Sequence, residues 1–167
     1  MKNLIVYSTR KGTSEKLAKM LADKFPGNTT LANVKENPSL KGYDNVILGG
    51  AVLAGEIKNG MRKFSESHLG ELKNCRIALF CCCISVDADK IKEYFVKSFP
   101  QELIEQAVAM ESLGGIYRPE KENFIMRTLF KLMKATAKEN ILEENIDKIA
   151  RCFISGGLVA GVYDKAD

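Results

Sequence analysis

The sequence has 167 residues, and 25 Lys and Arg against 21 Asp and Glu give a formal net charge of +4 at pH 7. This length favours one domain, and 46% apolar with 28% charged residues is a globular composition that excludes a disordered chain. No apolar run reaches the ~18 residues that a membrane span needs, and the apolar start of the chain is too short for a signal peptide. The three consecutive cysteines at 81–83 have neither disulfide nor metal-site spacing, so we expect no metal and a reducing, cytoplasmic environment.

Short apolar runs alternate with helical patterns along the chain, and no linker or repeat divides it. Leu17, Leu21 and Phe25, for example, recur at every fourth position and form one apolar face of a helix. Strands that are apolar on both faces and separated by helices predict a parallel sheet covered on both sides. The sequence therefore predicts a single doubly wound α/β domain over residues 1–167. Its strands are expected at 4–7, 29–34, 45–52, 76–84 and 107–115, and its helices at 12–25, 59–69, 87–99, 122–138 and 143–163.

The loop after the first predicted strand carries the strongest chemical signal. Ligands of doubly wound sheets bind beyond the carboxyl ends of the strands, and this loop combines four hydroxyls and one glycine with the start of a helix. An ordinary turn with Thr13 as the helix N-cap explains one or two of the hydroxyls but not the cluster. The pattern is neither GxxxxGK[ST] nor GxGxxG, which argues against triphosphate hydrolysis and weakens a dinucleotide interpretation. We predict a phosphate site in this loop, where Gly12 lets the backbone approach the ligand closely and Thr9, Thr13 and Ser14 can donate side-chain hydrogen bonds.

The stretch YSTRKGTS at 7–14 resembles the FMN phosphate loop of the flavodoxin superfamily. Within it, the segments 7–22, 43–64 and 114–137 most resemble the flavodoxin-domain family of menaquinone-dependent protoporphyrinogen oxidases. The third segment discriminates best, because short flavodoxins lack a matching basic helical segment. The resemblance implies a flavodoxin-like three-layer sandwich, a five-stranded parallel sheet of order 2-1-3-4-5, and non-covalently bound FMN as the cofactor.

The resemblance also implies which residues hold FMN. The phosphate would be bound by Ser8, Thr9, Arg10, Gly12, Thr13 and Ser14, with Lys11 either helping to neutralise it or simply solvated. The isoalloxazine ring would lie along Val52, Leu53, Ala54 and Gly55. Its other edge would meet backbone groups of Cys83, Ile84, Ser85, Val86 and Asp87. Tyr117 either folds over the ring or is a surface or hinge residue.

The predicted ring surroundings favour an enzyme over an electron carrier. The chain has no Trp, and neither 52–58 nor 84–88 contains an aromatic residue, so one face of the ring would be open to a flat quinone or tetrapyrrole. Carrier flavodoxins are typically acidic, which this chain is not. No pair of side chains has the spacing of an acid–base site, so the flavin would carry the chemistry.

The resemblance therefore implies an FMN-dependent oxidoreductase, similar to protoporphyrinogen oxidase, that passes electrons from its substrate through FMN to a quinone. The alternatives are a flavodoxin-type electron-transfer protein, a small FMN-dependent quinone or NAD(P)H reductase, and a ligand-binding module without catalysis. A homodimer is a further candidate assembly, and no nucleic acid partner is expected.

The positive charge is concentrated in one segment. Residues 117–138 contain six basic and two acidic residues, which leaves 19 of each sign elsewhere. On the predicted helix they form a basic stripe of Arg127, Lys131, Lys134 and Lys138. Either the apolar face of this helix packs on the body and the stripe is solvated, or the segment 117–138, a basic amphipathic insertion, lies against anionic lipid or guides a lipid-soluble partner into the flavin site. The second interpretation predicts a peripheral protein on the inner face of the cell membrane.

The three consecutive cysteines read as small buried side chains. Strand alternation predicts that Cys81 and Cys83 face one side of the sheet and Cys82 the other. Adjacent cysteines form strained disulfides, which argues against a redox role.

Overall fold

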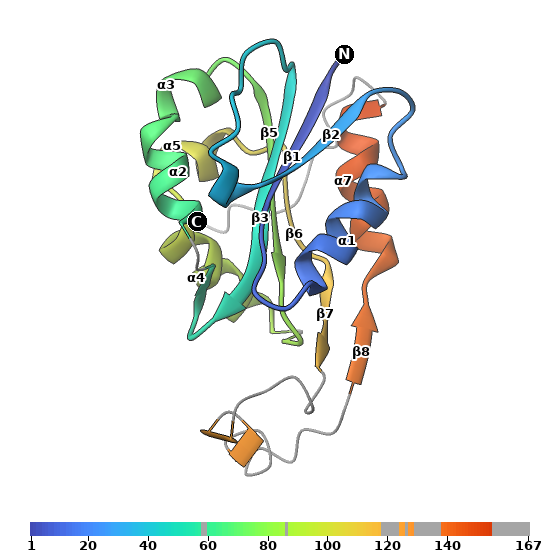
Figure 1. The fold of residues 1–167 in the computed structure, drawn as a ribbon, viewed down its shortest axis with the longest axis vertical. Coiled ribbons are helices and arrows are strands. Elements are labelled where there is room, and N and C mark those ends of the chain that lie inside the picture. Colours follow the sequence, from blue (N-terminus) through green and yellow to red (C-terminus); the bar gives the residue numbers. More distant parts are fainter. Residues whose placement is uncertain (58–59, 86, 118–123, 126, 129–137, 155–167) are drawn as a thin grey trace, which may run out of the picture.

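The computed structural model describes residues 1–57, 60–85, 87–117, 124–125, 127–128 and 138–154, with the backbone alone at 117 and 138. Its main sheet has the order β2-β1-β3-β5-β6, and these strands pair in parallel (Figure 1). The strands are β1 Asn3–Ser8, β2 Thr29–Asn33, β3 Asn45–Leu53, β5 Arg76–Cys82 and β6 Ala109–Ser112. The predicted fold and strand order are confirmed; the numbering differs because β4, Glu56–Ile57, was not predicted and pairs antiparallel with β3.

Helices cover both faces of the sheet (Figure 1). One face packs against α1 Thr13–Ala22 and α7 Glu143–Ile154. The other packs against the helices α2 Met61–Ser67, α3 Leu69–Leu72, α4 Ala88–Ser98 and α5 Gln101–Gln106. A short 3-10 helix, η1 Val34–Glu36, follows β2. The result is the predicted three-layer sandwich.

Alternation along the central strands divides the core between these two faces. In β1, Leu4 and Val6 belong to the cluster beneath α2 to α5, whereas Ile5 belongs to the cluster beneath α1 and α7. All three side chains are at most 1% exposed. Full burial of an aliphatic side chain of this size contributes about 1.5–3 kcal/mol, so both layers depend on the unbroken apolar runs seen in the sequence.

Two adjacent glycines let β3 approach its neighbours closely. A Cβ on Gly49 would lie 2.1 Å from the Phe80 carbonyl oxygen, and a Cβ on Gly50 would lie 2.1 Å from Ser8 Oγ. Phe80 is on β5 and Ser8 ends β1, so the Gly49–Gly50 pair accommodates groups from both adjacent strands. Gly50 also places β3 against the residue that begins the predicted phosphate loop.

The predicted fifth strand is wrong beyond Ser112. The chain turns at Gly114, where φ is 82°, and β7 Gly114–Tyr117 leaves the main sheet. It pairs antiparallel with β8 Lys138–Ile141 in a two-stranded ribbon that extends away from the body (Figure 1). A Cβ on Gly114 would lie 1.8 Å from the Asn140 carbonyl oxygen, so glycine is required at this crossing.

The predicted helices differ from the structure at several places. Helix α1 ends at Ala22 rather than at residue 25, and α5 was not predicted. The segment 59–69 is divided at His68 into α2 and α3. The helix predicted over 122–138 does not reach its end, because Lys138 begins β8; of the remainder, 124–125 and 127–128 are helical and the rest lies outside the described residues. Helix α7 is described to Ile154, and the predicted continuation to 163 lies outside the described residues.

Candidate functional site

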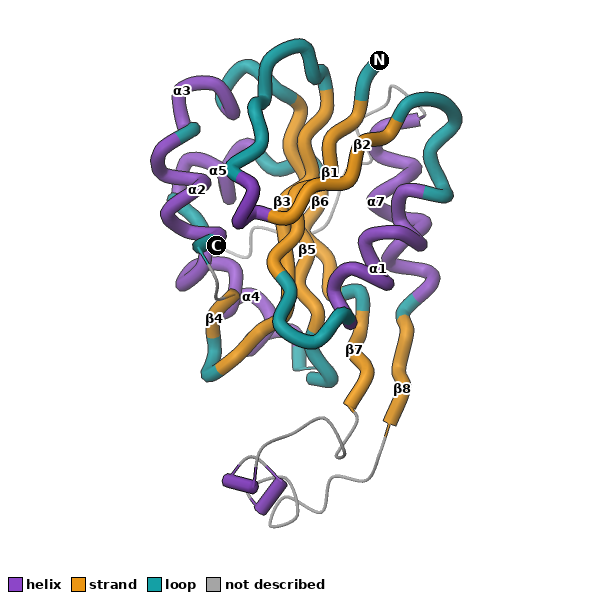
Figure 2. Tube along the Cα trace, viewed as in Figure 1, coloured by secondary structure: helices purple, strands orange, loops and turns teal. Residues whose placement is uncertain are grey.

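The carboxyl ends of the parallel strands align along one edge of the sheet. Ser8 is the register partner of Gly50, Gly50 of Cys81, and Cys81 of Ser112. The loops that follow β1, β3 and β5 therefore leave from the same edge, and Figure 2 shows them together at the end where β7 departs. The structure thus brings together the three segments from which the sequence predicted the FMN site.

The first loop turns on Gly12, which is the N-cap of α1 with φ of 87°. The Gly12 N–H donates to Thr9 Oγ1 at 3.0 Å, and the Gly12 carbonyl accepts the first helical bond from Lys16 N–H. Thr13 is therefore the first helical residue and not the N-cap, so that alternative for its hydroxyl is wrong. Gly12 has no side chain to cap the helix, and the N–H groups of the first turn have no partner within the helix itself.

Two buried hydroxyls lie beside this helix start. Ser8 is 1% exposed and Ser14 is fully buried, and neither Oγ has a hydrogen-bond partner among the described residues. Burial raises the pKa of the Cys82 thiol to about 12, and the nearby Ser14 hydroxyl opposes the rise, although no contact of hydrogen-bonding geometry joins the two side chains. Buried polar groups normally have partners, so two orphaned hydroxyls at a helix N-terminus fit a phosphate site.

The other candidate phosphate residues lie on the same loop. Arg10 is exposed, whereas Thr9, Lys11 and Thr13 are half-buried. Arg10 is therefore accessible to a ligand that approaches from solvent.

The second loop is a short β-hairpin. Val52 pairs with Ile57 and Leu53 with Glu56, which leaves Ala54 and Gly55 as the two turn residues. Their φ angles are 53° and 84°, both positive as a type I′ turn requires. The hairpin is anchored from outside, because the Ile57 N–H donates to Ser98 Oγ of α4 at 2.8 Å. The four residues predicted to border the ring therefore lie on an ordered structure.

The third loop joins β5 to α4. Asp87 caps α4, since its Oδ1 accepts the Lys90 N–H at 3.2 Å, and the Asp87 N–H donates to Ser85 Oγ at 3.3 Å. Cys83 and Ser85 are half-buried and Ile84 is 37% exposed. Val86 lies outside the described residues. The Asp87 carboxylate therefore holds the start of α4 in place beside this loop.

An aromatic side chain that the sequence analysis missed lies beside the hairpin. A Cβ on Gly55 would lie 4.0 Å from Tyr94 Cε1 and 3.9 Å from Lys97 Nζ, both on α4. Tyr94 is not in a predicted loop but in the middle of a helix, some forty residues further along the chain. Only the packing of α4 against β4 brings it there, so sequence spacing gives no signal for it.

The basic segment is only partly described. The backbones of Tyr117 and Lys138 are paired with each other across the ribbon, while their side chains, like Lys131 and Lys134, lie outside the described residues. Arg127 is exposed. Next to it, Phe124 and Ile125 are 83% and 75% exposed, which is unusual for large apolar side chains. Over the described part of the chain, no helix is both long enough and apolar enough to cross a bilayer.

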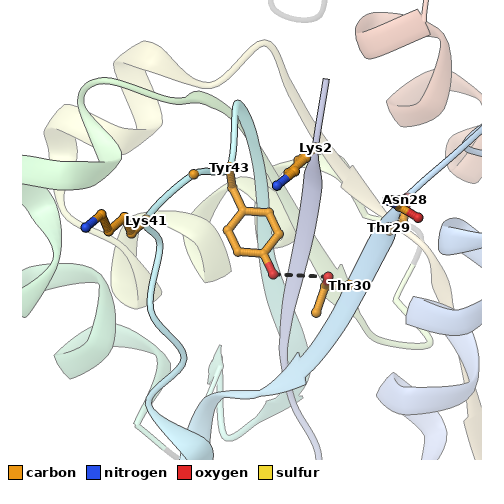
Figure 3. A pocket seen from close by; sticks show the side chains of 7 residues that line it. Lys2, Asn28, Thr29, Thr30, Lys41 and Tyr43 are labelled. Carbon is orange, nitrogen blue, oxygen red and sulfur yellow. Dashed lines mark hydrogen bonds between the residues drawn. The ribbon is translucent and has the colours of Figure 1, made fainter.

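A shallow polar cavity of about 280 Å³ lies at the opposite end of the sheet, where β1, β2 and β3 begin (Figure 3). The Tyr43 hydroxyl donates to Thr30 Oγ1 across it at 3.0 Å. None of its lining residues belongs to the predicted site. They are Lys2, Asn28, Thr29, Thr30, Lys41, Gly42 and Tyr43.

Comparison with known proteins agrees with this architecture. The chain is 29% identical over 85 residues to protoporphyrinogen IX dehydrogenase [quinone] of Escherichia coli strain K12, with the same values for that of E. coli O157:H7. The match covers 48% of this chain, which spans about half the length (47%) of these curated relatives. The oxidised flavodoxin 2 of Bacillus cereus has the same fold, with a TM-score of 0.51 and 20% identity over 94% of this chain and 100% of that one. Residues 4–141 match the flavodoxin domain, and the chain belongs to that family.

Proposed function

We propose that this protein binds FMN at the carboxyl edge of the sheet and is an FMN-dependent oxidoreductase. The observation that carries the proposal is the pair of orphaned, buried hydroxyls of Ser8 and Ser14 beside the glycine-capped start of α1. The Ser14 and Thr13 hydroxyls, together with the first N–H groups of α1, would hold the phosphate, and the positive end of the helix dipole favours its charge. Arg10 would approach it from the solvent side.

The remaining loops would hold the ring. The 52–57 hairpin would border one side, and backbone groups of 83–87 would border the other. Bound FMN supplies the redox chemistry, and the protein positions it and shapes the access of a partner. The described residues of both loops are aliphatic or polar, so no aromatic side chain from them would cover the ring against a flat substrate, and Tyr94 lies beside the turn of the hairpin.

We propose further that the substrate is a quinone, a tetrapyrrole or both, with electrons passing from the substrate through FMN to the quinone. The support is the similarity to protoporphyrinogen IX dehydrogenase [quinone] over about half of each chain. The 117–138 insertion would meet the anionic inner surface of the cell membrane through Arg127, Lys131, Lys134 and Lys138. The exposed apolar side chains of Phe124 and Ile125 support this proposal, because they could be buried against a membrane or a partner molecule.

The first test is cofactor uptake. The purified protein should be yellow, and the apoprotein should take up FMN in preference to FAD. A colourless protein that ignores FMN would contradict the whole proposal.

The second test separates an enzyme from a carrier. After anaerobic reduction of the flavoprotein, its reoxidation is followed with a menaquinone analogue and, separately, with a one-electron protein acceptor. Fast reaction with the quinone and turnover with protoporphyrinogen are the expected results. Fast reaction with the protein acceptor alone would identify an electron-transfer protein instead, and reduction by NAD(P)H would identify a small reductase.

A further inference from the structure

Two thiols meet on one face of the sheet at the carboxyl end of β5. Cys81 Sγ lies 3.9 Å from Cys83 Sγ, which is van der Waals contact between two sulfur atoms. Cys81 is fully buried in the cluster beneath α2 to α5, whereas Cys83 is half-buried just beyond the end of the strand. Cys82 lies in the cluster on the other face, as strand alternation predicted. The pair therefore joins a half-buried cysteine to a fully buried one.

The surroundings of Cys83 favour its thiolate. Its sulfur lies 3.4 Å from Ser112 Oγ, which is buried and already accepts the Gly114 N–H at 3.3 Å. The serine hydroxyl hydrogen can therefore point at the Cys83 sulfur. The Cys81 thiol and, secondly, the Ser112 hydroxyl lower the pKa of Cys83 to about 7, while burial opposes them. Contact with Cys83 and burial raise the pKa of Cys81, so the more exposed sulfur of the pair carries the charge.

The other half-buried cysteine is a natural comparison. The Cys75 thiol donates to the carbonyl oxygens of Tyr43 at 3.5 Å and Glu71 at 3.6 Å, contacts that need the protonated sulfur. Burial, followed by the nearby Glu71 carboxylate, raises the pKa of Cys75. Cys83 makes one such contact, to the Ser85 carbonyl oxygen at 3.7 Å. It also has two neighbours of a kind that Cys75 lacks among the described residues, Cys81 Sγ and Ser112 Oγ, and these lower its pKa.

We propose that Cys81 and Cys83 form a redox-active dithiol that hydrogen peroxide oxidises to an intramolecular disulfide. The Cys83 thiolate attacks a peroxide oxygen: the S–O bond forms, the O–O bond breaks, and the departing hydroxide takes a proton from solvent to become water. The Cys81 sulfur then attacks the Cys83 sulfur: the S–S bond forms, the S–O bond breaks, and the hydroxyl leaves with the Cys81 proton as a second water. One peroxide is reduced and two thiols are oxidised.

The position of Cys83 makes the closure feasible. The sulfurs must approach from 3.9 Å to the ~2.0 Å of a disulfide. Because β5 ends at Cys82, Cys83 can move without breaking the pairing of that strand. Cys83 also begins the 83–87 loop, so disulfide formation would displace one wall of the proposed FMN site and weaken cofactor binding. This last link rests on the proposed function.

The dithiol is tested by peptide mass spectrometry after peroxide treatment of the whole protein as purified. The protein is reduced, freed of reductant, treated with hydrogen peroxide, alkylated and digested with trypsin, which releases all three consecutive cysteines in the peptide 77–90. We expect this peptide to lose two hydrogens and to keep one alkylated cysteine. Cys83→Ser and Cys81→Ser should each abolish the loss. Cys82→Ser and Cys75→Ser, the latter a change at the other half-buried cysteine, should leave it intact.

Three alkylated cysteines in the peroxide-treated peptide, or a persistent loss of two hydrogens in Cys83→Ser, would overturn the proposal. Release of FMN, followed by its fluorescence in the same samples, tests the link to the cofactor. If the protein never binds FMN, the proposed function is wrong, but the peptide mass still shows whether Cys81 and Cys83 form a disulfide.

Discussion

Glu111 has a buried side-chain carboxyl group, and burial disfavours its charged form. It lies on β6, is 9% exposed, and faces α7. Burial is the main cause that raises the pKa of its carboxyl; Lys148 opposes the rise and Glu144 adds to it. The folded protein therefore binds this proton more tightly than the unfolded chain does. Its contribution to stability is full below the ordinary pKa of glutamate, about 4.3, and is lost as the pH rises through the higher folded value.

We expect Glu111→Gln to be more stable than the wild type near neutral pH, because the variant does not bury a charge there. The advantage should shrink as the pH falls through the raised folded pKa of Glu111 towards about 4.3, and below that pH, where the wild-type carboxyl is protonated in both states, it should be smallest and constant. Urea unfolding of both proteins across this range measures the difference. Glu102→Gln, at an exposed position of α5, is the control and should show no such trend. An equal free energy difference at every pH would contradict the assignment.

Ser14→Ala tests the phosphate site at single-atom level. It should weaken FMN binding by about 1–3 kcal/mol, because a buried donor to a charged group is lost. The cofactor-free protein should not lose stability, since Ser14 Oγ has no hydrogen-bond partner among the described residues. Fluorescence titration with FMN and urea unfolding of the apoprotein supply the two readouts. Ser39→Ala, at an exposed position outside the three loops of the site, should leave FMN affinity unchanged, although it removes the acceptor of the Lys41 N–H. Unchanged FMN affinity in Ser14→Ala would move the phosphate elsewhere.

At the scale of elements, the helices and strands that leave a local pattern in the sequence were predicted, and those that depend on contacts between distant segments were missed. Apolar runs and their period identified β1, β3, β5 and α1, since burial on two faces leaves a strong pattern. The two-residue β4 and the turn of the chain at Gly114 were missed, because both depend on contacts with distant segments. The same division holds in the site: the phosphate loop is local in sequence and was found, whereas Tyr94 reaches the hairpin only through tertiary packing.

The packing of β3 makes a sharp prediction at this scale. Gly50→Ala should lower the free energy of unfolding by at least about 1–3 kcal/mol, because its Cβ would lie 2.1 Å from Ser8 Oγ and 2.6 Å from the Ser8 carbonyl oxygen. Gly70→Ala is the matched control: it lies on α3, nothing lies within 4 Å of the added methyl, and its stability should stay the same or rise. Chemical denaturation measures both, and equal stabilities of the two variants would show that β3 adapts.

At the scale of the whole molecule, the charge separates into a balanced body and a basic insertion. If the insertion meets anionic lipid, the protein should pellet with phosphatidylserine vesicles at low salt and less at high salt. Replacement of Arg127, Lys131, Lys134 and Lys138 by Glu should abolish pelleting. Replacement of Lys35, Lys41, Lys63 and Lys73, which are exposed on the body, changes the net charge equally and should have little effect. If both variants lose pelleting equally, net charge explains the binding. If the wild type does not pellet, the lipid hypothesis is wrong.

The register of the β7–β8 ribbon also bears on how such proteins diversify. Tyr117 faces Lys138, so the chain leaves and rejoins the ribbon at neighbouring points. The entropic contribution to the free energy of closing a loop rises by only about 0.6 kcal/mol for each doubling of its length. Evolution can therefore lengthen, shorten or replace the intervening residues at small thermodynamic cost, without altering the sheet or the edge that holds the candidate site. Partner specificity and cofactor binding can change independently in such an arrangement.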